Sequence, residues 1–173
     1  MLVAPSTWKD TGKGRKRMII KGLNECDVVN YKKTSMFIIF PHCSFKCDRE
    51  CGRNVCQNSA LACAPIFEID TEKIIERYVN NPLTKALICG GLEPFDSWEE
   101  LQDLVINFRQ QSNDDIVIYT GYTEEEIKDK VEWLNLYSPI IIKYGRFIPS
   151  QEKHYDEILG VDLASPNQYA KEY

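Results

Sequence analysis

The sequence lacks an apolar run of about 18 residues, and it lacks the short apolar segment that is typical of a secretory signal. A membrane-spanning helix needs roughly 20 mostly apolar residues, and a signal peptide needs about 7 to 15. Both absences argue against a membrane-embedded or exported protein. We therefore expect a cytoplasmic protein that has no membrane partner.

An excess of positive charge is also missing. The chain contains 21 Lys and Arg against 26 Asp and Glu, which gives a formal net charge of -5. Proteins that bind nucleic acid use basic surface to neutralise phosphates, so we expect no nucleic-acid partner. One basic cluster exists, at Lys13, Arg15, Lys16 and Arg17, and glycines separate its members. We interpret residues 1–17 as a flexible basic tail.

Internal repeats and low-complexity segments are missing as well, which argues against a repeat array or a long linker. The chain has 173 residues, of which 43% are hydrophobic and 27% charged, as in an ordinary globular domain. A complete eight-fold β/α barrel needs roughly 200 residues or more, so the chain is too short to form one. We expect a single domain over residues 18–173.

Cysteine, in contrast, is abundant and unevenly distributed. Four of the seven cysteines follow the apolar run at residues 36–40, and these four are Cys43, Cys47, Cys51 and Cys56. Several thiolates on one loop can bind a metal cluster, because sulfur is a soft ligand that suits iron. A structural zinc site usually has two separated Cys-x2-Cys pairs, which this sequence lacks, and the reducing cytoplasm disfavours disulfides. The pattern therefore favours an iron–sulfur cluster.

Short apolar runs alternate with segments of helical periodicity along the rest of the chain. Buried strands are predicted at residues 36–40, 86–89, 116–119 and 139–143. Helices are predicted to follow Asp70 or Thr71, a capping box of Ser97 with Glu100, and a second capping box of Thr123 with Glu126. Two further short strands are predicted at 18–21 and 26–31, around a turn at 22–24. The alternation predicts an α/β fold built from parallel βαβ units.

Ligands of such folds bind at the carboxyl ends of the strands. Three segments besides the cysteine loop follow predicted strands, and these are Gly90–Pro94, Thr120–Tyr122 and Gly145–Phe147. Paired glycines allow the backbone to approach a ligand closely, and the Glu93 carboxylate can accept an ammonium group. An ordinary tight turn before a helix explains the Gly-Gly-x-Glu-Pro pattern equally well, and this interpretation stays open.

Together these segments resemble the radical S-adenosylmethionine (SAM) enzymes, and more narrowly the activating proteins of anaerobic ribonucleotide reductases. The resemblance extends from Asp27 to Gln168. The segments that carry it are Asp27–Asn30 with 36–40, Cys56–Asn58, Gly90–Pro94, Tyr119–Thr123 with Glu125 and Glu126, Gly145–Phe147, and Ala164–Gln168. Their shared order is more specific than any one segment. The resemblance implies a partial, open parallel β/α barrel of the radical SAM type.

The cysteine spacing departs from the usual pattern of this family. The family's cluster motif is Cys-x3-Cys-x2-Cys; Cys43 and Cys47 fit its first gap, but the expected third position holds Glu50. We assign the third ligand to Cys56, because the two residues that follow it match the family motif. An insertion then contains Cys51. The alternative ligand set is Cys43, Cys47 and Cys51.

The resemblance implies two cofactors, a 4Fe-4S cluster and SAM. Three thiolates would bind three irons and leave the fourth open to SAM, whose reductive cleavage gives methionine and a 5'-deoxyadenosyl radical. The implied SAM contacts are Gly90, Gly91 and Glu93 at the ammonium group, Val55 at the adenine, and Thr120 and Gly121 at the remaining wall. Asn58 is expected to support the loop through hydrogen bonds. Leu92 lies between the glycines and Glu93, so the direction in which the Glu93 carboxylate points stays open.

The resemblance also implies a protein substrate. In this family the radical takes a hydrogen atom from a glycine of the large subunit of the anaerobic ribonucleotide reductase, and a low-potential donor such as flavodoxin or ferredoxin supplies the electron. Arg146, Asn167 and Gln168 are candidates for contacts with that partner or with the SAM carboxylate; ordinary loop hydrogen bonding is the other interpretation.

Two other functions stay open. The first is a radical SAM enzyme that acts on another peptide or on a small molecule. The second is a non-catalytic iron–sulfur protein with four cysteine ligands, Cys51 among them. The first differs from an activase only in its substrate, whereas the second would not cleave SAM and would use Cys51 as a ligand.

Overall fold

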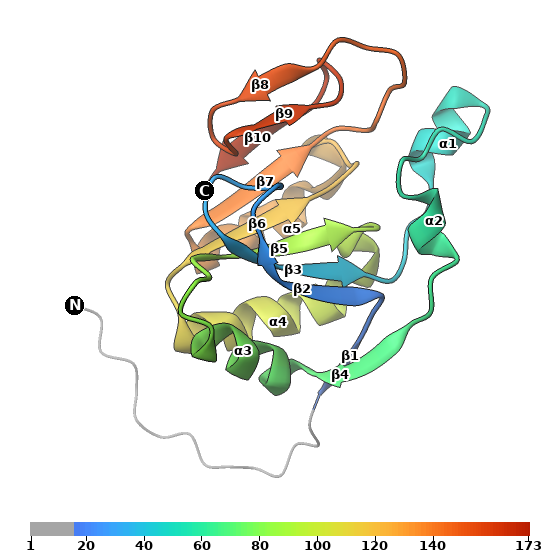
Figure 1. The fold of residues 1–173 in the computed structure, drawn as a ribbon. Coiled ribbons are helices and arrows are strands. Elements are labelled where there is room, and N and C mark those ends of the chain that lie inside the picture. Colours follow the sequence, from blue (N-terminus) through green and yellow to red (C-terminus); the bar gives the residue numbers. More distant parts are fainter. Residues whose placement is uncertain (1–15) are drawn as a thin grey trace.

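The computed structural model describes residues 16–173 and centres on a six-stranded sheet with the strand order β10-β7-β6-β5-β3-β2 (Figure 1). Its strands are β2 (Gly22–Asp27), β3 (Ser35–Phe40), β5 (Ala86–Gly91), β6 (Asp115–Tyr119), β7 (Ile140–Tyr144) and β10 (Tyr169–Glu172). The four central strands, β3, β5, β6 and β7, are parallel. The edge strands β2 and β10 are antiparallel to their neighbours, so the sheet is mixed.

The central strands read as continuous apolar runs because both of their faces are covered. On one face lie the helices α3 (Thr71–Asn80), α4 (Trp98–Gln111) and α5 (Lys128–Leu134) (Figure 1). Their apolar sides pack on alternate strand residues in the larger core cluster, for example Leu101 and Phe108 against Leu87 and Ile118. The apolar residues of this layer recur about every 3.6 residues along the helices and every second residue along the strands, so each element turns one apolar side to the core.

A second core cluster covers the opposite face of the sheet. There Ile88, Val117 and Ile141 pack with Leu159 and Leu163. The last two belong to the segment that contains the hairpin strands β8 (His154–Asp156) and β9 (Val161–Leu163). The sheet therefore lies between a helical layer and a smaller C-terminal layer.

The loop after β3 lies at the carboxyl ends of the parallel strands. It contains the short helices α1 (Lys46–Cys51) and α2 (Ser59–Ala62), drawn in cyan and green at the end to which the strand arrows point (Figure 1). It then continues into β4 (Phe67–Asp70), which pairs with β1 (Arg17–Ile20). Three 3-10 helices complete the fold: η1 (Pro94–Ser97), η2 (Glu125–Ile127) and η3 (Asn135–Tyr137).

The four predicted buried strands and the three predicted helices are present, but the prediction of a strand at 26–31 is wrong. The strand is β2, in which Gly22–Asn24 pair with β3 instead of forming a turn. It ends at Asp27, whose carboxylate accepts the backbone N–H groups of Val29 and Asn30 and turns the chain. A side-chain-to-backbone turn of this kind stops a strand locally.

The two predicted capping boxes differ in outcome. Glu126 accepts the backbone N–H of Thr123 at 2.9 Å, and Thr123 Oγ1 accepts the N–H of Glu126 at 3.4 Å. Ser97, in contrast, makes no capping hydrogen bond, and its buried hydroxyl has no partner among the described residues. Ser97 is the last residue of the 3-10 helix η1, so its position before α4 is already part of a tight turn.

The expected basic tail falls largely outside the described residues, which begin at residue 16. Its proposed boundary at residue 17 is wrong, because Arg17 begins β1 and lies opposite Asp70 in the β1–β4 pair. Lys16 forms an ion pair of 3.0 Å with Asp103. Within the described part of the chain, no helix combines the length and apolarity needed to cross a membrane. The partial-barrel interpretation stays a prediction, since the observed sheet is mixed at both edges.

Candidate iron–sulfur site

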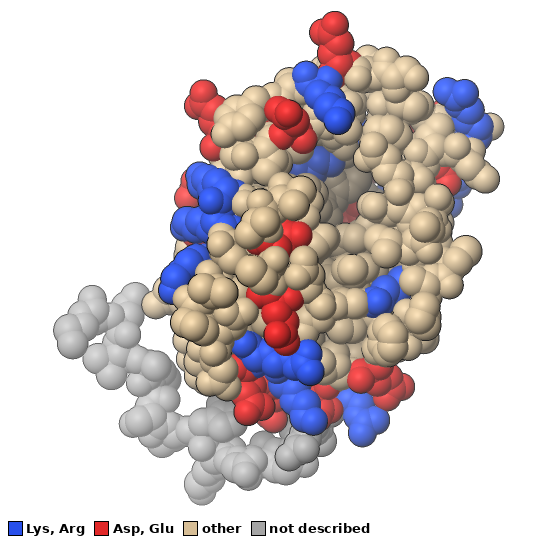
Figure 2. Space-filling model, in the orientation of Figure 1, with Lys and Arg blue, Asp and Glu red and all other residues tan. Residues whose placement is uncertain are grey.

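A cavity of about 350 Å³ lies at the carboxyl ends of the parallel strands. Predicted site residues that line it are Cys43, Cys47, Cys56, Asn58, Gly91, Glu93, Thr120, Gly121 and Gln168. Lining residues that the sequence analysis did not single out include Asn30, Phe37, Ile39, Tyr119 and Lys143. Figure 2 shows that this face of the molecule is hollowed between the C-terminal strands and the α1–α2 segment.

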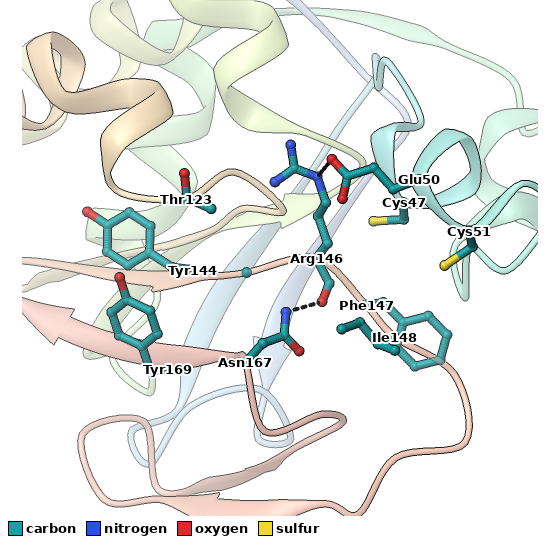
Figure 3. A pocket seen from close by; sticks show the side chains of 11 residues that line it. Cys47, Glu50, Cys51, Thr123, Tyr144, Arg146, Phe147, Ile148, Asn167 and Tyr169 are labelled. Carbon is teal, nitrogen blue, oxygen red and sulfur yellow. Dashed lines mark hydrogen bonds and ion pairs between the residues drawn. The ribbon is translucent and has the colours of Figure 1, made fainter.

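Cys51 borders a different cavity. This second cavity, of about 390 Å³, is lined by Cys51, Glu50, Arg146, Phe147 and Asn167, among others (Figure 3). Cys47 borders both cavities. The structure thus groups Cys43, Cys47 and Cys56 around one space and turns Cys51 toward the adjoining one.

The insertion between Cys47 and Cys56 folds back on itself through Asp48. The Asp48 carboxylate oxygen Oδ1 accepts the backbone N–H groups of Val55 at 2.7 Å and of Cys56 at 2.8 Å. Gly52 makes this return possible, because it ends α1 with a φ of 64°. One side chain therefore brings Cys56 back to the cavity that Cys43 and Cys47 border.

Asn58 connects the cysteine loop to the glycine pair. Its Nδ2 donates a hydrogen bond of 2.7 Å to the carbonyl oxygen of Gly91, in agreement with the expected supporting role. A second connection joins the backbone N–H of Glu93 to the carbonyl oxygen of His42 at 2.7 Å. The segments that follow β3 are thereby hydrogen-bonded at two points to the end of β5 and the residues after it.

The cysteine thiols are suited to a metal cluster. Burial raises the pKa of Cys43 to about 11 and also raises the pKa of Cys47. Loading with iron would therefore release protons from these thiols. The backbone N–H of Phe45 lies 3.2 Å from Cys43 Sγ, and such N–H···S bonds stabilise cluster sulfurs.

The cysteine thiols are the donor set that a cluster would use. Among residues 16–173, no three His, Cys, Asp or Glu side chains form a group that could hold one metal ion. In a cluster each thiolate binds its own iron, so the ligands do not converge on one atom. Cys43, Cys47 and Cys56 are free and border one cavity.

The Glu93 carboxylate faces the end of β6. It accepts hydrogen bonds from Thr120 Oγ1 at 2.8 Å, from the N–H of Gly121 at 2.9 Å and from the N–H of Phe95 at 3.2 Å. Only 6% of Glu93 is exposed, and this burial raises its pKa to about 7. A carboxylate has about four lone-pair positions, so one remains for a further donor.

The glycine pair is required by packing. A Cβ at Gly90 would lie 2.9 Å from Cε2 of Phe37, and a Cβ at Gly91 would lie 2.5 Å from Cγ2 of Ile39. Gly91 also has a φ of 87°, which L side chains rarely adopt. Gly90 and Val55 do not line the cavity, so their predicted SAM contacts have no direct counterpart in it.

The C-terminal candidates separate into two groups. Gln168 is buried beside the first cavity and joins the N–H of Ala164 to the carbonyl of Gly145. Arg146 and Asn167 border the second cavity, where Asn167 Nδ2 donates to the Arg146 carbonyl oxygen at 2.9 Å (Figure 3). Gln168 thus lines the first cavity, whereas Arg146 and Asn167 line the second; Arg146 reaches the edge of the first through a hydrogen bond of 3.2 Å to the carbonyl oxygen of Gly121.

The Arg146 guanidinium is occupied by acidic side chains. It donates to both carboxylate oxygens of Glu126, at 2.9 and 2.7 Å. Its Nε lies 2.8 Å from Glu50 Oε1, an ion pair whose angle falls outside hydrogen-bond geometry (Figure 3). Lys46 also contacts Glu126, at 3.0 Å. These charges fasten α1, which holds Lys46 and Glu50, to the η2 segment.

Two residues that sequence reasoning missed organise the site. Lys143 gave a detectable signal, because a lysine at the end of the apolar run 140–142 is unusual in a buried strand. Asp48 gave none, since an acidic residue after a cysteine is compatible with any loop. The role of Asp48 becomes visible only in the folded chain, where its carboxylate accepts the backbone N–H groups of Val55 and Cys56.

Comparison with known families identifies the class of this site. Residues 32–164, most of the chain, match the family described as "4Fe-4S single cluster domain". The chain belongs to this family, which is found in radical SAM-type enzymes. Searches of curated proteins and of solved structures return no match. Family membership indicates a 4Fe-4S cluster as the cofactor, in agreement with the cysteine loop.

Proposed function

We propose that this protein is a radical SAM activase, which generates a glycyl radical on the large subunit of an anaerobic ribonucleotide reductase. One observation carries the proposal. Cys43, Cys47 and Cys56 border the same cavity as the Gly91–Glu93 strand end and the Thr120–Gly121 segment. A cluster-binding loop and a polar strand edge around one space suit a cofactor that contacts both.

In this account Cys43, Cys47 and Cys56 hold the cluster. When bound, a reduced 4Fe-4S cluster with one open iron and SAM supply a 5'-deoxyadenosyl radical. Asp48 fixes the backbone of the third ligand, and Asn58 fixes the distance between the cysteine loop and Gly91.

The chain's own groups would orient SAM. Glu93 keeps one lone-pair position for an ammonium N–H after its three hydrogen bonds to Thr120, Gly121 and Phe95. Phe37, Ile39 and Tyr119 supply an apolar wall of the same cavity. Such a wall favours the adenosyl moiety and excludes water from it.

The second cavity suits a segment of the protein partner. It adjoins the first at Cys47, and its lining contains the half-exposed side chains of Ile148 and Tyr169. Arg146 and Asn167 line this second cavity. The acidic side chains beside Arg146 hold its guanidinium in place. A flavodoxin or ferredoxin in the cytoplasm would supply the electron.

One alternative also has a specific observation in its favour. Cys51 is a free, partly exposed cysteine that borders the second cavity together with Cys47, so it is available to a four-cysteine, non-catalytic cluster. A radical SAM enzyme with another peptide or small-molecule substrate would keep the same cavity and differ only in its partner.

Electron paramagnetic resonance tests the proposed substrate. The cluster-loaded protein is reduced anaerobically with SAM and mixed with the anaerobic reductase from the same genome. We expect a glycyl-radical doublet, which is absent with a Cys43→Ala variant. SAM cleavage without a doublet would reject this partner and favour another substrate.

A further inference from the structure

Lys143 is a buried cation beside the cluster-side cavity. It ends the run Ile140–Ile142 in β7, and only 7% of its surface is exposed. Side chains alternate along a strand, so Lys143 lies on the same face as Ile141, which packs in the C-terminal core cluster. Lysine is almost never buried unless a partner compensates its charge.

The protein supplies only part of that compensation. Lys143 Nζ donates one hydrogen bond, of 3.1 Å, to the carbonyl oxygen of Gly145. No other hydrogen bond or ion pair within residues 16–173 involves this ammonium group. An ammonium has three donors, so two N–H groups lack a protein partner beside the cavity that Lys143 lines.

No carboxylate of the described residues neutralises Lys143 by contact. Glu93 lines the same cavity, but its oxygens are engaged by Thr120, Gly121 and Phe95. Burial lowers the pKa of Lys143 to about 8, so the ammonium remains the major form at neutral pH. A buried ammonium with free donors requires an anion.

We propose that Lys143 binds the carboxylate of the aminoacyl group of SAM. This inference rests on the proposed function and adds a residue that the family resemblance did not assign. Glu93 and Lys143 border one cavity and carry opposite charges, as an aminoacyl zwitterion requires. Glu93 would accept the ammonium group, while the two free donors of Lys143 would bind the carboxylate oxygens.

A different role for Lys143 makes different predictions. The ammonium would in that case only offset the negative charge of the cluster thiolates, of which Cys47 is electrostatically coupled to Lys143. Loss of the charge would then reduce cluster content or change the binding of every SAM analogue equally. A carboxylate-binding residue instead affects only those ligands that carry the carboxylate.

The test compares SAM with decarboxylated SAM, which has the same sulfonium, amine and adenosine but lacks the carboxylate. Equilibrium dialysis gives Kd for both ligands on cluster-loaded wild-type protein and on the variants Lys143→Met, Lys143→Gln and Lys143→Arg. Lys130→Met is the matched control, because Lys130 Nζ also donates to a backbone carbonyl, that of Phe95, outside this cavity. Iron content and far-UV circular dichroism verify loading and folding.

For Lys143→Met we expect the affinity for SAM to fall roughly 10- to 100-fold, the range of a charge-assisted hydrogen bond, and the affinity for decarboxylated SAM to change less than about twofold. Lys143→Gln gives the same selective loss if the Met variant does not fold, and Lys143→Arg retains the preference for the carboxylate. Equal effects on both ligands, or no effect on SAM, would overturn the role of Lys143 alone. Wild-type protein that does not bind SAM would overturn this role and the proposed function together.

Discussion

Asp48 accepts the backbone N–H of Cys56 at 2.8 Å, although eight positions separate the two residues in the chain. The same carboxylate oxygen accepts the N–H of Val55. This contact closes the insertion that replaces the expected Cys-x2-Cys spacing. It explains how Cys56 borders the cavity of Cys43 and Cys47, while Cys51, at the end of α1, borders only the adjoining cavity.

The first prediction concerns the third cluster ligand. Cys56→Ala is expected to lose most of the 4Fe-4S cluster after anaerobic reconstitution, because two thiolates cannot hold it stably. Cys51→Ala is expected to retain wild-type content, since Cys51 does not border that cavity. Iron and sulfide analysis, with Cys43→Ala as the reference for full loss, gives the answer. If Cys51→Ala loses the cluster as completely as Cys43→Ala, the four-cysteine alternative gains and our ligand set is wrong.

The second prediction concerns Asp48. Asp48→Ala leaves the N–H groups of Val55 and Cys56 without their acceptor, at a cost of about 1–3 kcal/mol in the order of the loop. We expect reduced cluster content or a faster loss of iron to a chelator. Asp48→Asn keeps an oxygen at the same place and should restore most of the loading. Asp129→Ala, an exposed aspartate on α5, serves as the control. Equal chelation rates for Asp48→Ala and the wild type would remove Asp48 from the account.

A third prediction follows from the Arg146–Glu126 pair. The guanidinium is only 10% exposed and contacts both carboxylate oxygens. Arg146→Ala should lower the free energy of unfolding by about 1–3 kcal/mol, because it removes two charge-assisted hydrogen bonds from the Glu126 carboxylate, which keeps only those from Thr123 and Lys46. A double-mutant cycle with Glu126→Ala in urea denaturation should give a coupling energy of about 1 kcal/mol. A coupling energy near zero would show that the pair does not stabilise the contact between η2 and the segment after β7.

The fourth prediction is a pH dependence caused by Glu93. Burial raises its pKa from 4.5 to about 7 in the folded chain. The folded state therefore holds a proton that the unfolded state has already released, so the free energy of unfolding falls as pH rises from about 4.5 to about 7. The contribution is fully present below this window, and its loss is on the order of 3 kcal/mol.

Urea denaturation of the cluster-free protein between pH 5 and 8 measures this effect. Glu93→Gln removes the titrating group, so the stability difference between the wild type and this variant should decrease steadily with pH. The other ionisable groups titrate in both proteins and cancel in the difference. Two curves that run parallel across this range would show that Glu93 titrates normally.

The central strands and the short strand β1, predicted at 18–21, could be predicted from the sequence, whereas the short C-terminal strands could not. A strand covered on both faces, such as β5 or β7, is a continuous apolar run. Strands β8, β9 and β10 have three or four residues each, and β10 forms only by pairing with β7, about 25 positions earlier. Such pairing depends on the folded sheet and leaves little local pattern.

Site residues could be predicted where they directly follow apolar strands in the sequence. They could not be predicted where their positions depend on contacts that form only in the folded chain. The cysteines and the Gly90–Glu93 turn follow apolar runs, so their meeting at one edge follows from a parallel sheet. The position of Val55 outside the cavity could not be predicted, because the Asp48 hydrogen bonds set the path of the insertion. The engagement of Arg146 by Glu126 likewise depends on the fold, which brings the segment after β7 beside η2.

Formation of 5'-deoxyadenosine from SAM tests the central claim most directly. The protein is reconstituted anaerobically with iron and sulfide, its cluster content is measured, and it is reduced with dithionite in the presence of SAM. Our account predicts 5'-deoxyadenosine and methionine in equal amounts, and neither product from Cys56→Ala. A fully loaded, reducible cluster that yields no 5'-deoxyadenosine would contradict a radical SAM function and leave a closed, non-catalytic iron–sulfur protein.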